Sequence, residues 1–234
     1  MKNAYKKFGY YYDEVMSELN YDLWLEFVEP YLKKDDKILD LACGTGTFCT
    51  MLKLKGYEVE GLDLSDTIIE IAKEKMKINH LNFPLYVMDM TNFHLNKKFN
   101  VITCFFDSIN FLSSQNELKK LFDTVYSHLE ENGLFILDIF SKEMMNEYEN
   151  NEIHDDYQTF KLDWTTKKTS PTTLMHTITI SEDDEEFKEK YYEYYYDIKD
   201  LPSKKFKMIK LVGDFNDDLE PEDERILIVY KKIN

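Results

Sequence analysis

Four aspartates stand at the ends of successive apolar segments, and a glycine-rich turn follows the first of them. They are Asp40, Asp63, Asp89 and Asp107. The turn is the stretch Ala-Cys-Gly-Thr-Gly at 42–46. Glycine has no side chain to hold a ligand off, so such a turn brings backbone close to a bound molecule. An acid at position 40 would repel a phosphate and favour a cationic group. These residues therefore predict a binding site for a ligand with a positively charged end.

The segments that carry these residues alternate between strand-like and helix-like patterns from 37 to about 141. The candidate strands are 37–43, 58–64, 84–90, 100–107 and 133–140. The segment 65–79 follows an expected N-cap at Ser65, and Ser114 with Glu117 forms a capping-box pattern before a helix that Gly133 is expected to stop. The alternation predicts an α/β fold with a parallel sheet. In such sheets ligands bind beyond the carboxyl ends of the strands, where the aspartates fall.

The pattern changes after Ser141 to strands without intervening helices. Segments 157–166, 172–181 and 186–198 predict a small antiparallel sheet, and 206–215 with 225–232 predicts a closing hairpin. Segments 9–19 and 21–32 predict two helices before the first strand. The expected organisation is an N-terminal helical lid at 1–36, a core at 37–145 and 199–234, and an inserted β subdomain at 146–198.

The residues of the glycine-rich turn indicate which classes of nucleotide cofactor could bind there. Asp63 follows Gly46 at close to the spacing of about 20 residues at which an acid accepts the ribose hydroxyls of several nucleotides. A dinucleotide site needs a third glycine, but Cys49 occupies that position. The phosphate-binding loop with a Gly-Lys-Ser/Thr ending is also absent. A dinucleotide or a triphosphate therefore fits this turn poorly.

The composition of the chain limits the classes of molecule that the protein can bind. The formal net charge of the 234 residues is −16, which opposes binding to nucleic acid. The three cysteines, Cys43, Cys49 and Cys104, lie in apolar segments and are expected to be buried thiols in a reducing compartment. We expect no metal site, no signal peptide, no membrane-spanning segment and a cytoplasmic protein.

The stretches "LDLACGTGTF", "GLDLS" and "VMDM" resemble the class I S-adenosylmethionine-dependent methyltransferases over residues 36–141. The chain is similar in particular to small bacterial members with an antiparallel insertion before the last two strands, and more distantly to glycine and sugar-nucleotide N-methyltransferases. The resemblance implies a Rossmann-like sheet of order 3-2-1-4-5-7-6 with the last strand antiparallel. It implies S-adenosylmethionine as cofactor and S-adenosylhomocysteine as product.

The resemblance also implies roles for individual positions. The methionine end would be held by Asp40 and the backbone at Ala42, Gly44 and Gly46. The ribose and adenine would be held by Asp63, Leu64, Asp89 and Met90. The sulfonium would lie beside Phe105 and Asp107, and the lid would place Tyr12, Tyr21 and Trp24 over the cofactor. Each has a structural alternative, because such aspartates also cap helices or begin turns and such aromatic residues also pack in cores.

Methyl transfer from a sulfonium is a direct displacement that needs alignment and sometimes a base. The candidate bases are Asp107 and His176, although His176 alternates with apolar residues and could equally be a core residue. Asn110 and the tyrosines of 191–196 are further candidates for the site or for packing. The motif of DNA amino-methylating enzymes is absent after the fourth strand.

These observations predict transfer to a nitrogen or oxygen of a small molecule by a monomer or homodimer, with the insertion binding the acceptor. A protein methyltransferase, a donor-binding module without turnover and, least favoured, a nicotinamide dehydrogenase remain as alternatives. Only the stretch 198–206 precedes the sixth core strand, where the family usually has a helix. That departure predicts different packing there and a surface for self-association.

Overall fold

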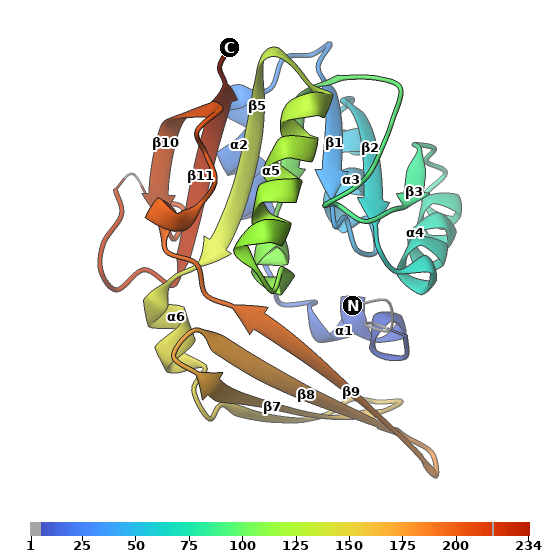
Figure 1. Ribbon diagram of the computed structural model, residues 1–234. Coiled ribbons are helices and arrows are strands. Elements are labelled where there is room, and N and C mark those ends of the chain that lie inside the picture. Colours follow the sequence, from blue (N-terminus) through green and yellow to red (C-terminus); the bar gives the residue numbers. More distant parts are fainter. Residues whose placement is uncertain (1–5, 217) are drawn as a thin grey trace.

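The computed structural model describes residues 6–216 and 218–234, and its centre is a seven-stranded mixed sheet. The sheet order is β3-β2-β1-β4-β5-β11-β10, which confirms the predicted topology (Figure 1). Its strands are β1 (Lys37–Leu41), β2 (Glu58–Asp63), β3 (Leu85–Val87), β4 (Phe99–Cys104), β5 (Leu129–Phe140), β10 (Phe206–Gly213) and β11 (Arg225–Lys232). The first five run parallel, whereas β11 is antiparallel to both of its neighbours.

Helices cover the two faces of this sheet unequally (Figure 1). On one face, α5 (Gln115–His128) packs its apolar side into a large cluster with β4, β5 and β11. On the other face lie α2 (Asp22–Val28), α3 (Thr47–Leu54) and α4 (Asp66–Ile78). Ser65 caps α4 and Ser114 caps α5, as predicted, through bonds from the amides of Ile68 and Glu117.

The end of α5 differs from the prediction. The helix ends at His128 and β5 begins at once with Leu129, so Gly133 lies inside the strand and is not a helix stop. The reason is the pairing of Leu129 with Phe99 at the start of β4, which draws the residues after the helix into the sheet. Tertiary pairing here overrides a local stop signal.

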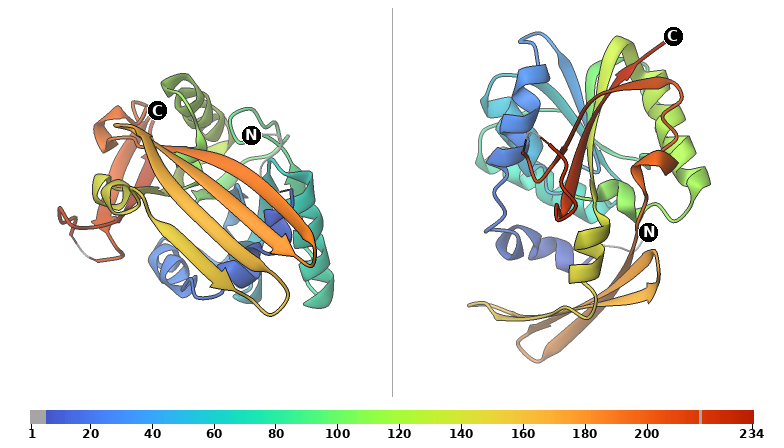
Figure 2. Two further views of the ribbon diagram at one scale, coloured as in Figure 1. Left: turned by 90° about the horizontal axis from the view of Figure 1, so that it is seen from below. Right: turned by 90° about the vertical axis from the view of Figure 1, so that its left-hand side faces the viewer.

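A separate four-stranded antiparallel sheet lies beyond the carboxyl ends of the parallel strands (Figure 2). It follows α6 (Lys142–Glu147) and has the order β6-β7-β8-β9, with bounds Glu152–Asp156, Lys161–Ser170, Thr173–Glu182 and Glu185–Tyr194. Three of these strands were predicted. The sequence did not predict β6, because its five residues are all exposed and carry no apolar alternation.

The N-terminal segment lies between the core and the inserted sheet, as Figure 1 shows for α1. The two predicted helices are shorter than expected: the elements are η1 (Phe8–Tyr10), α1 (Tyr12–Val15), α2 and η2 (Glu29–Tyr31). Residues 1–5 of the predicted lid lie outside the described residues. The division into lid, core and insertion stays a prediction.

The connector between the inserted sheet and β10 contains only a short turn of helix, η4 (Ile198–Asp200), as the sequence indicated. Tyr196, Leu201 and Phe206 are buried there against the cluster around α5. These side chains therefore add to the apolar cluster on the face of the sheet that α5 covers. No helix among the described residues is long and apolar enough to cross a membrane.

Candidate functional site

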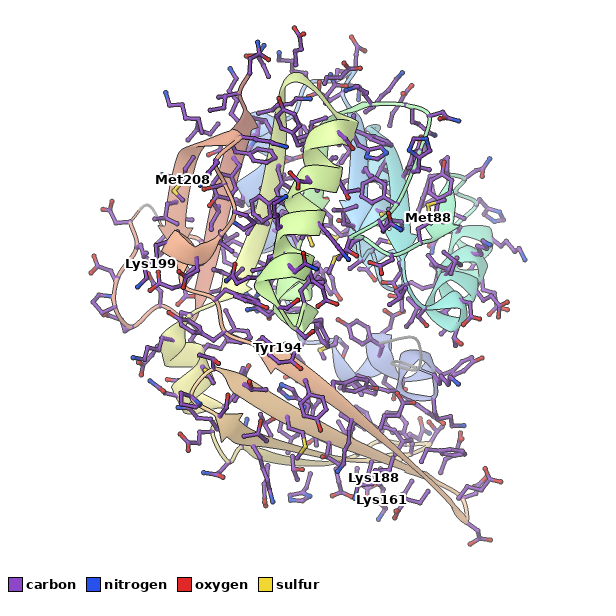
Figure 3. The ribbon with its side chains drawn as sticks, viewed as in Figure 1. Met88, Lys161, Lys188, Tyr194, Lys199 and Met208 are labelled. Atoms are coloured by element: carbon purple, nitrogen blue, oxygen red, sulfur yellow. The ribbon has the colours of Figure 1, made fainter. Side chains whose placement is uncertain are left out.

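A cavity opens at the carboxyl ends of β1, β2 and β4, beneath the N-terminal segment. Ten of the predicted site residues line it, namely Tyr12, Tyr21, Asp40, Ala42, Gly44, Asp63, Leu64, Asp89, Met90 and Phe105. Four predicted residues do not line it, namely Trp24, Gly46, Asp107 and His176. Met88 contributes another apolar wall, and Figure 3 shows it beside β3.

The glycine turn gives the cavity its floor. Ala42, Gly44 and Gly46 all have positive φ, at 53°, 55° and 75°. A Cβ added to Gly44 would meet no atom within 4 Å, so the backbone there borders open space. A Cβ on Gly46 would meet Ala72 of α4 at 3.4 Å, because Gly46 faces that helix. The two glycines therefore serve different purposes: one leaves room for a ligand and the other lets α3 begin close to α4.

Asp63 is tied to the glycine turn by its backbone contacts. Its Oδ2 accepts from the Gly44 amide at 3.1 Å, and its Oδ1 accepts from the Ser65 amide at 2.9 Å. Burial raises the pKa of Asp63, while these amide bonds act in the opposite direction. Each carboxylate oxygen can accept more than one bond, so Asp63 can still receive two hydroxyl donors from the cavity.

Asp40 is more deeply buried, at 4% exposure. Its Oδ1 accepts from the Thr103 hydroxyl at 2.6 Å, and its Oδ2 contacts the Cys49 thiol at 3.5 Å. Burial raises the pKa of Asp40 to about 7, against the effect of these two bonds. A cation brought into the cavity would favour the ionised form and lower that pKa.

Asp89 is exposed at the rim, where it both begins a turn and lines the cavity. Its Oδ1 accepts from the amide and the hydroxyl of Thr91, each at 2.8 Å. The turn that was the structural alternative is thus present. The turn uses Oδ1, which leaves Oδ2 as the oxygen that can accept from a ligand in the cavity.

Aromatic rings form the roof and one wall. Tyr12 and Tyr21 come from the N-terminal segment, while Phe105 and Phe106 follow β4. Burial raises the pKa of both tyrosines, that of Tyr21 to about 12, so their hydroxyls remain protonated at neutral pH. Aromatic faces attract a nearby cation.

Trp24 lies behind this wall and not over the cavity. Its ring packs on Phe106 with centroids 4.5 Å apart, and it is 2% exposed. The sequence pattern placed Trp24 on the lid with Tyr12 and Tyr21, but α2 turns its indole into the core. Its Nε1 donates to Asp138 Oδ2 at 2.7 Å.

Asp107 is half of an ion pair. Arg225 Nη1 and Nη2 donate to its two carboxylate oxygens at 2.7 and 2.9 Å. Arg225 also donates to Asp138 at 3.0 Å. The guanidinium occupies both carboxylate oxygens, and Asp107 does not line the cavity, so the geometry argues against Asp107 as a general base.

His176 lies in the inserted sheet with both ring nitrogens engaged. Trp164 Nε1 donates to Nδ1 at 3.1 Å, so Nδ1 is the acceptor and Nε2 carries the proton toward Glu193 at 3.0 Å. Thr166 lies 3.0 Å from the same Nδ1. The ring is 6% exposed and satisfied within the sheet, which matches the structural alternative.

A polar cluster beside the glycine turn was not predicted. Lys75 Nζ donates to Asp13 at 2.6 Å, to Thr47 at 2.8 Å and to Thr45 at 3.1 Å. The Thr45 hydroxyl donates to the other oxygen of Asp13 at 2.6 Å. The cluster joins α1 to the turn and to α4. Asp13 and Lys75 are 62 residues apart in the sequence. No local sequence pattern could therefore predict the cluster.

Comparison with known proteins agrees with this geometry. Residues 38–133 match the family described as methyltransferase domain. A putative methyltransferase of Geobacillus sp. (strain WCH70) is 29% identical, over 98% of this chain and 100% of that one. The crystal structure of an S-adenosylmethionine-dependent methyltransferase from Clostridium acetobutylicum is also 29% identical, with a TM-score of 0.85 over 99% of this chain and 100% of that one. An S-adenosylmethionine-bound amino pentose methyltransferase from Micromonospora echinaspora shares the fold, with a TM-score of 0.73 at 15% identity over the full length of both chains.

The strand order, the glycine turn and these relatives define a Rossmann-like methyltransferase. The protein is an S-adenosylmethionine-dependent methyltransferase, and S-adenosylmethionine is its methyl donor.

The cavity fits this donor on chemical grounds. None of its described lining residues is Lys, Arg or His, whereas three are aspartates. A sulfonium with an α-ammonium group suits such a surface, and a pyrophosphate does not. Among the described residues no group of three or more His, Cys, Asp or Glu is arranged to hold a metal ion.

Proposed function

We propose that the enzyme methylates a nitrogen or oxygen of a small molecule, and that nitrogen is the better fit. The observation that carries this proposal is the enclosure of the cavity by the N-terminal segment, which is held from both sides. On the core side, Asp13 bonds Thr45 and Lys75. On the side of the inserted sheet, Glu182 accepts from Lys7 at 2.9 Å and from Tyr11 at 2.6 Å. A covered site favours an acceptor small enough to enter beneath that segment over a folded protein.

The donor supplies an electrophilic methyl group when bound. In this proposal Asp63 accepts the ribose hydroxyls, and Leu64, Met88 and Met90 pack on the adenine. Asp89 accepts from the adenine amino group. These assignments rest on the positions of the side chains around one cavity and on the spare lone pairs of the two carboxylates.

The methionine end of the donor is assigned to Asp40 and to the backbone at Ala42 and Gly44. Tyr12, Tyr21 and Phe105 present their rings to the same region, where a positive sulfur would lie. The chain thus aligns the donor and excludes water, which is the main requirement of a direct displacement.

The preference for nitrogen follows from the ionisable groups. Among the described lining residues, the carboxyls are those assigned to the donor, and the two tyrosines remain protonated. Asp107 is paired with Arg225, and His176 is engaged inside the inserted sheet. An amine can lose its proton to solvent before it binds and then attack as the free base, whereas a hydroxyl acceptor needs a base in the site. The amino-sugar N,N-dimethyltransferases to which part of this chain is similar agree with an amine acceptor.

The test is release of S-adenosylhomocysteine from S-adenosylmethionine with panels of acceptors. One panel holds amino sugars and other small amines, a second holds phenols, alcohols and carboxylic acids, and a third holds basic proteins. Turnover with small amines supports the proposal. Turnover only with basic proteins, falling steeply with added salt because the acidic surface attracts them, supports a protein methyltransferase instead. Donor binding without turnover on any panel would contradict the proposal.

A further inference from the structure

The segment after β4, residues 105–108, forms a wall of the donor cavity in an unusual backbone conformation. Phe106 and Asp107 both have φ of 58°, and neither is glycine. Two successive left-handed residues with side chains cost conformational free energy, so the surrounding structure must hold them. Phe105, Phe106 and Ser108 line the cavity, which makes the shape of this segment part of the donor site.

Asp138 supplies the first support. It lies on β5, is fully buried, and its two oxygens accept from two successive amides, that of Phe106 at 3.1 Å and that of Asp107 at 2.9 Å. Successive backbone amides that converge on one carboxylate are an anion-binding arrangement. The indole of Trp24 donates to the same carboxylate from α2.

Arg225 supplies the second support. It begins β11, where its backbone pairs with Phe140 at the end of β5, and its guanidinium bridges the carboxylates of Asp107 and Asp138. Burial lowers the pKa of Arg225, but the two carboxylates outweigh burial and raise it. Burial raises the pKa of Asp138, and Arg225 opposes that rise. The buried carboxylate of Asp138 and the partly buried carboxylate of Asp107 share this one cation.

The chemistry at this point needs arginine in particular. Arg225 is the only arginine in the sequence, in which lysine supplies every other basic residue apart from histidine. Only a planar guanidinium can place one nitrogen between two carboxylates and a second on Asp107. Its plane also lies over the Trp24 ring, with the guanidinium carbon 5.1 Å from the ring centroid.

We infer that Asp138 and Arg225 are positioning residues for the methyl donor: together they hold Phe106 and Asp107 in the left-handed conformation that shapes the cavity wall. They act through Phe106 and Asp107 and do not themselves line the cavity. The inference rests on the donor and not on the acceptor, so it can fail or hold independently of the proposed amine substrate.

The first experiment measures S-adenosylhomocysteine binding by calorimetry to the full chain and to Arg225→Lys and Asp138→Asn. Arg225→Lys keeps the positive charge but loses the pair of guanidinium nitrogens that contacts the two carboxylates. Asp138→Asn replaces one acceptor oxygen by an amide group that donates toward other donors. The matched control is Lys232→Met, which removes another buried cation of β11, one that donates to the carbonyls of Tyr126 and Leu129 away from the cavity. We expect each test variant to weaken binding at least tenfold and the control to change it less than twofold, with thermal unfolding recorded for all.

The second measurement is amide exchange, and its result in the unsubstituted protein does not depend on any variant. Amide exchange in the unsubstituted protein should be slow at Phe106 and Asp107, and in Arg225→Lys it should quicken at least tenfold at these two positions. Retention of binding within twofold in both test variants would overturn the inference. Equal loss in Lys232→Met, or rapid exchange of both amides in the unsubstituted protein, would overturn it as well.

Discussion

Lys75 of α4 and Asp13 of α1 form an ion pair of 2.6 Å beside the glycine turn. Thr45 and Thr47 share its hydrogen bonds, so the N-terminal segment, the turn and α4 meet in one cluster. Asp13 follows Tyr12, whose ring covers the cavity. The ion pair lies outside the cavity, but it holds the segment that places the Tyr12 ring over the cavity.

Loss of this pair should speed escape of the donor. We expect Asp13→Asn or Lys75→Met to raise the dissociation rate of S-adenosylmethionine about fivefold to tenfold, because the roof opens more often, as measured by stopped-flow displacement. The matched control is Lys119→Met, which removes an exposed pair with Asp123 on α5. An unchanged dissociation rate in both lid variants would show that the cluster does not hold the roof.

The positive-φ glycines give a second comparison. Gly44→Ala and Gly56→Ala both place a side chain at positive φ, and such a residue costs about 1 kcal/mol. Only Gly44 borders the cavity, whereas a Cβ on Gly56 would meet the flexible end of Lys34. We expect similar loss of stability in both variants and at least tenfold weaker donor binding in Gly44→Ala alone. Equal donor affinity in the two variants would contradict the role of the turn.

The raised pKa of Asp40 predicts a pH dependence. Because the folded-state pKa is about 7 and the ordinary value is 3.8, the folded protein holds this proton more tightly than the unfolded chain. The resulting stability is fully present below about pH 3.8 and is lost as pH rises through 7. Asp40→Asn should remove this loss. Its free energy of unfolding, measured by denaturant titration, should therefore fall less between pH 5 and about 7.5 than that of the unsubstituted protein.

The same carboxyl should couple donor binding to a proton. A cationic donor favours ionised Asp40, so affinity should rise between pH 5.5 and about 7 with release of a proton. Calorimetry in buffers of different ionisation enthalpy detects that release, and Asp40→Asn should lack it. Proton release that persists in Asp40→Asn would assign the effect to another group.

His176 is expected to be dispensable for chemistry. His176→Gln keeps hydrogen-bonding capacity beside Glu193 and should retain kcat within about threefold, with an unchanged pH profile, once an acceptor is identified. A fall of more than a hundredfold in kcat with normal folding would restore the base role that the sequence suggested.

Site residues that lie at the end of a predicted strand could be identified from the sequence. Residues that only the tertiary fold brings together could not. The glycine turn and Asp63 were found from their spacing, because a strand–turn–helix unit and the next strand end bring them to one edge. Arg225 and Asp138 were missed as site residues because antiparallel pairing of β5 with β11 brings them together. The sequence offered two clues to this pair. Asp138 is a charged residue within the apolar segment 133–140, and Arg225 is the only arginine in the sequence.

Trp24 and His176 show what residue type leaves open, because it suggested a role for each side chain and a structural alternative without deciding between them. A helical pattern does not say which aromatic residue faces the cavity, and α2 buries Trp24 behind Phe106. Strand alternation did place His176 on the apolar face, and its partners Trp164 and Glu193 account for it there.

The central claim is that the cavity at the glycine turn binds S-adenosylmethionine through Asp63. Its most direct test is calorimetric titration of S-adenosylmethionine and, separately, NADH into the protein, Asp63→Ala and the exposed control Asp66→Ala. We predict micromolar binding of the methyl donor alone, weakened at least tenfold, about 1.4 kcal/mol, by Asp63→Ala and unaffected by Asp66→Ala. Unchanged donor affinity in Asp63→Ala, or binding of NADH in place of the methyl donor, would contradict the account.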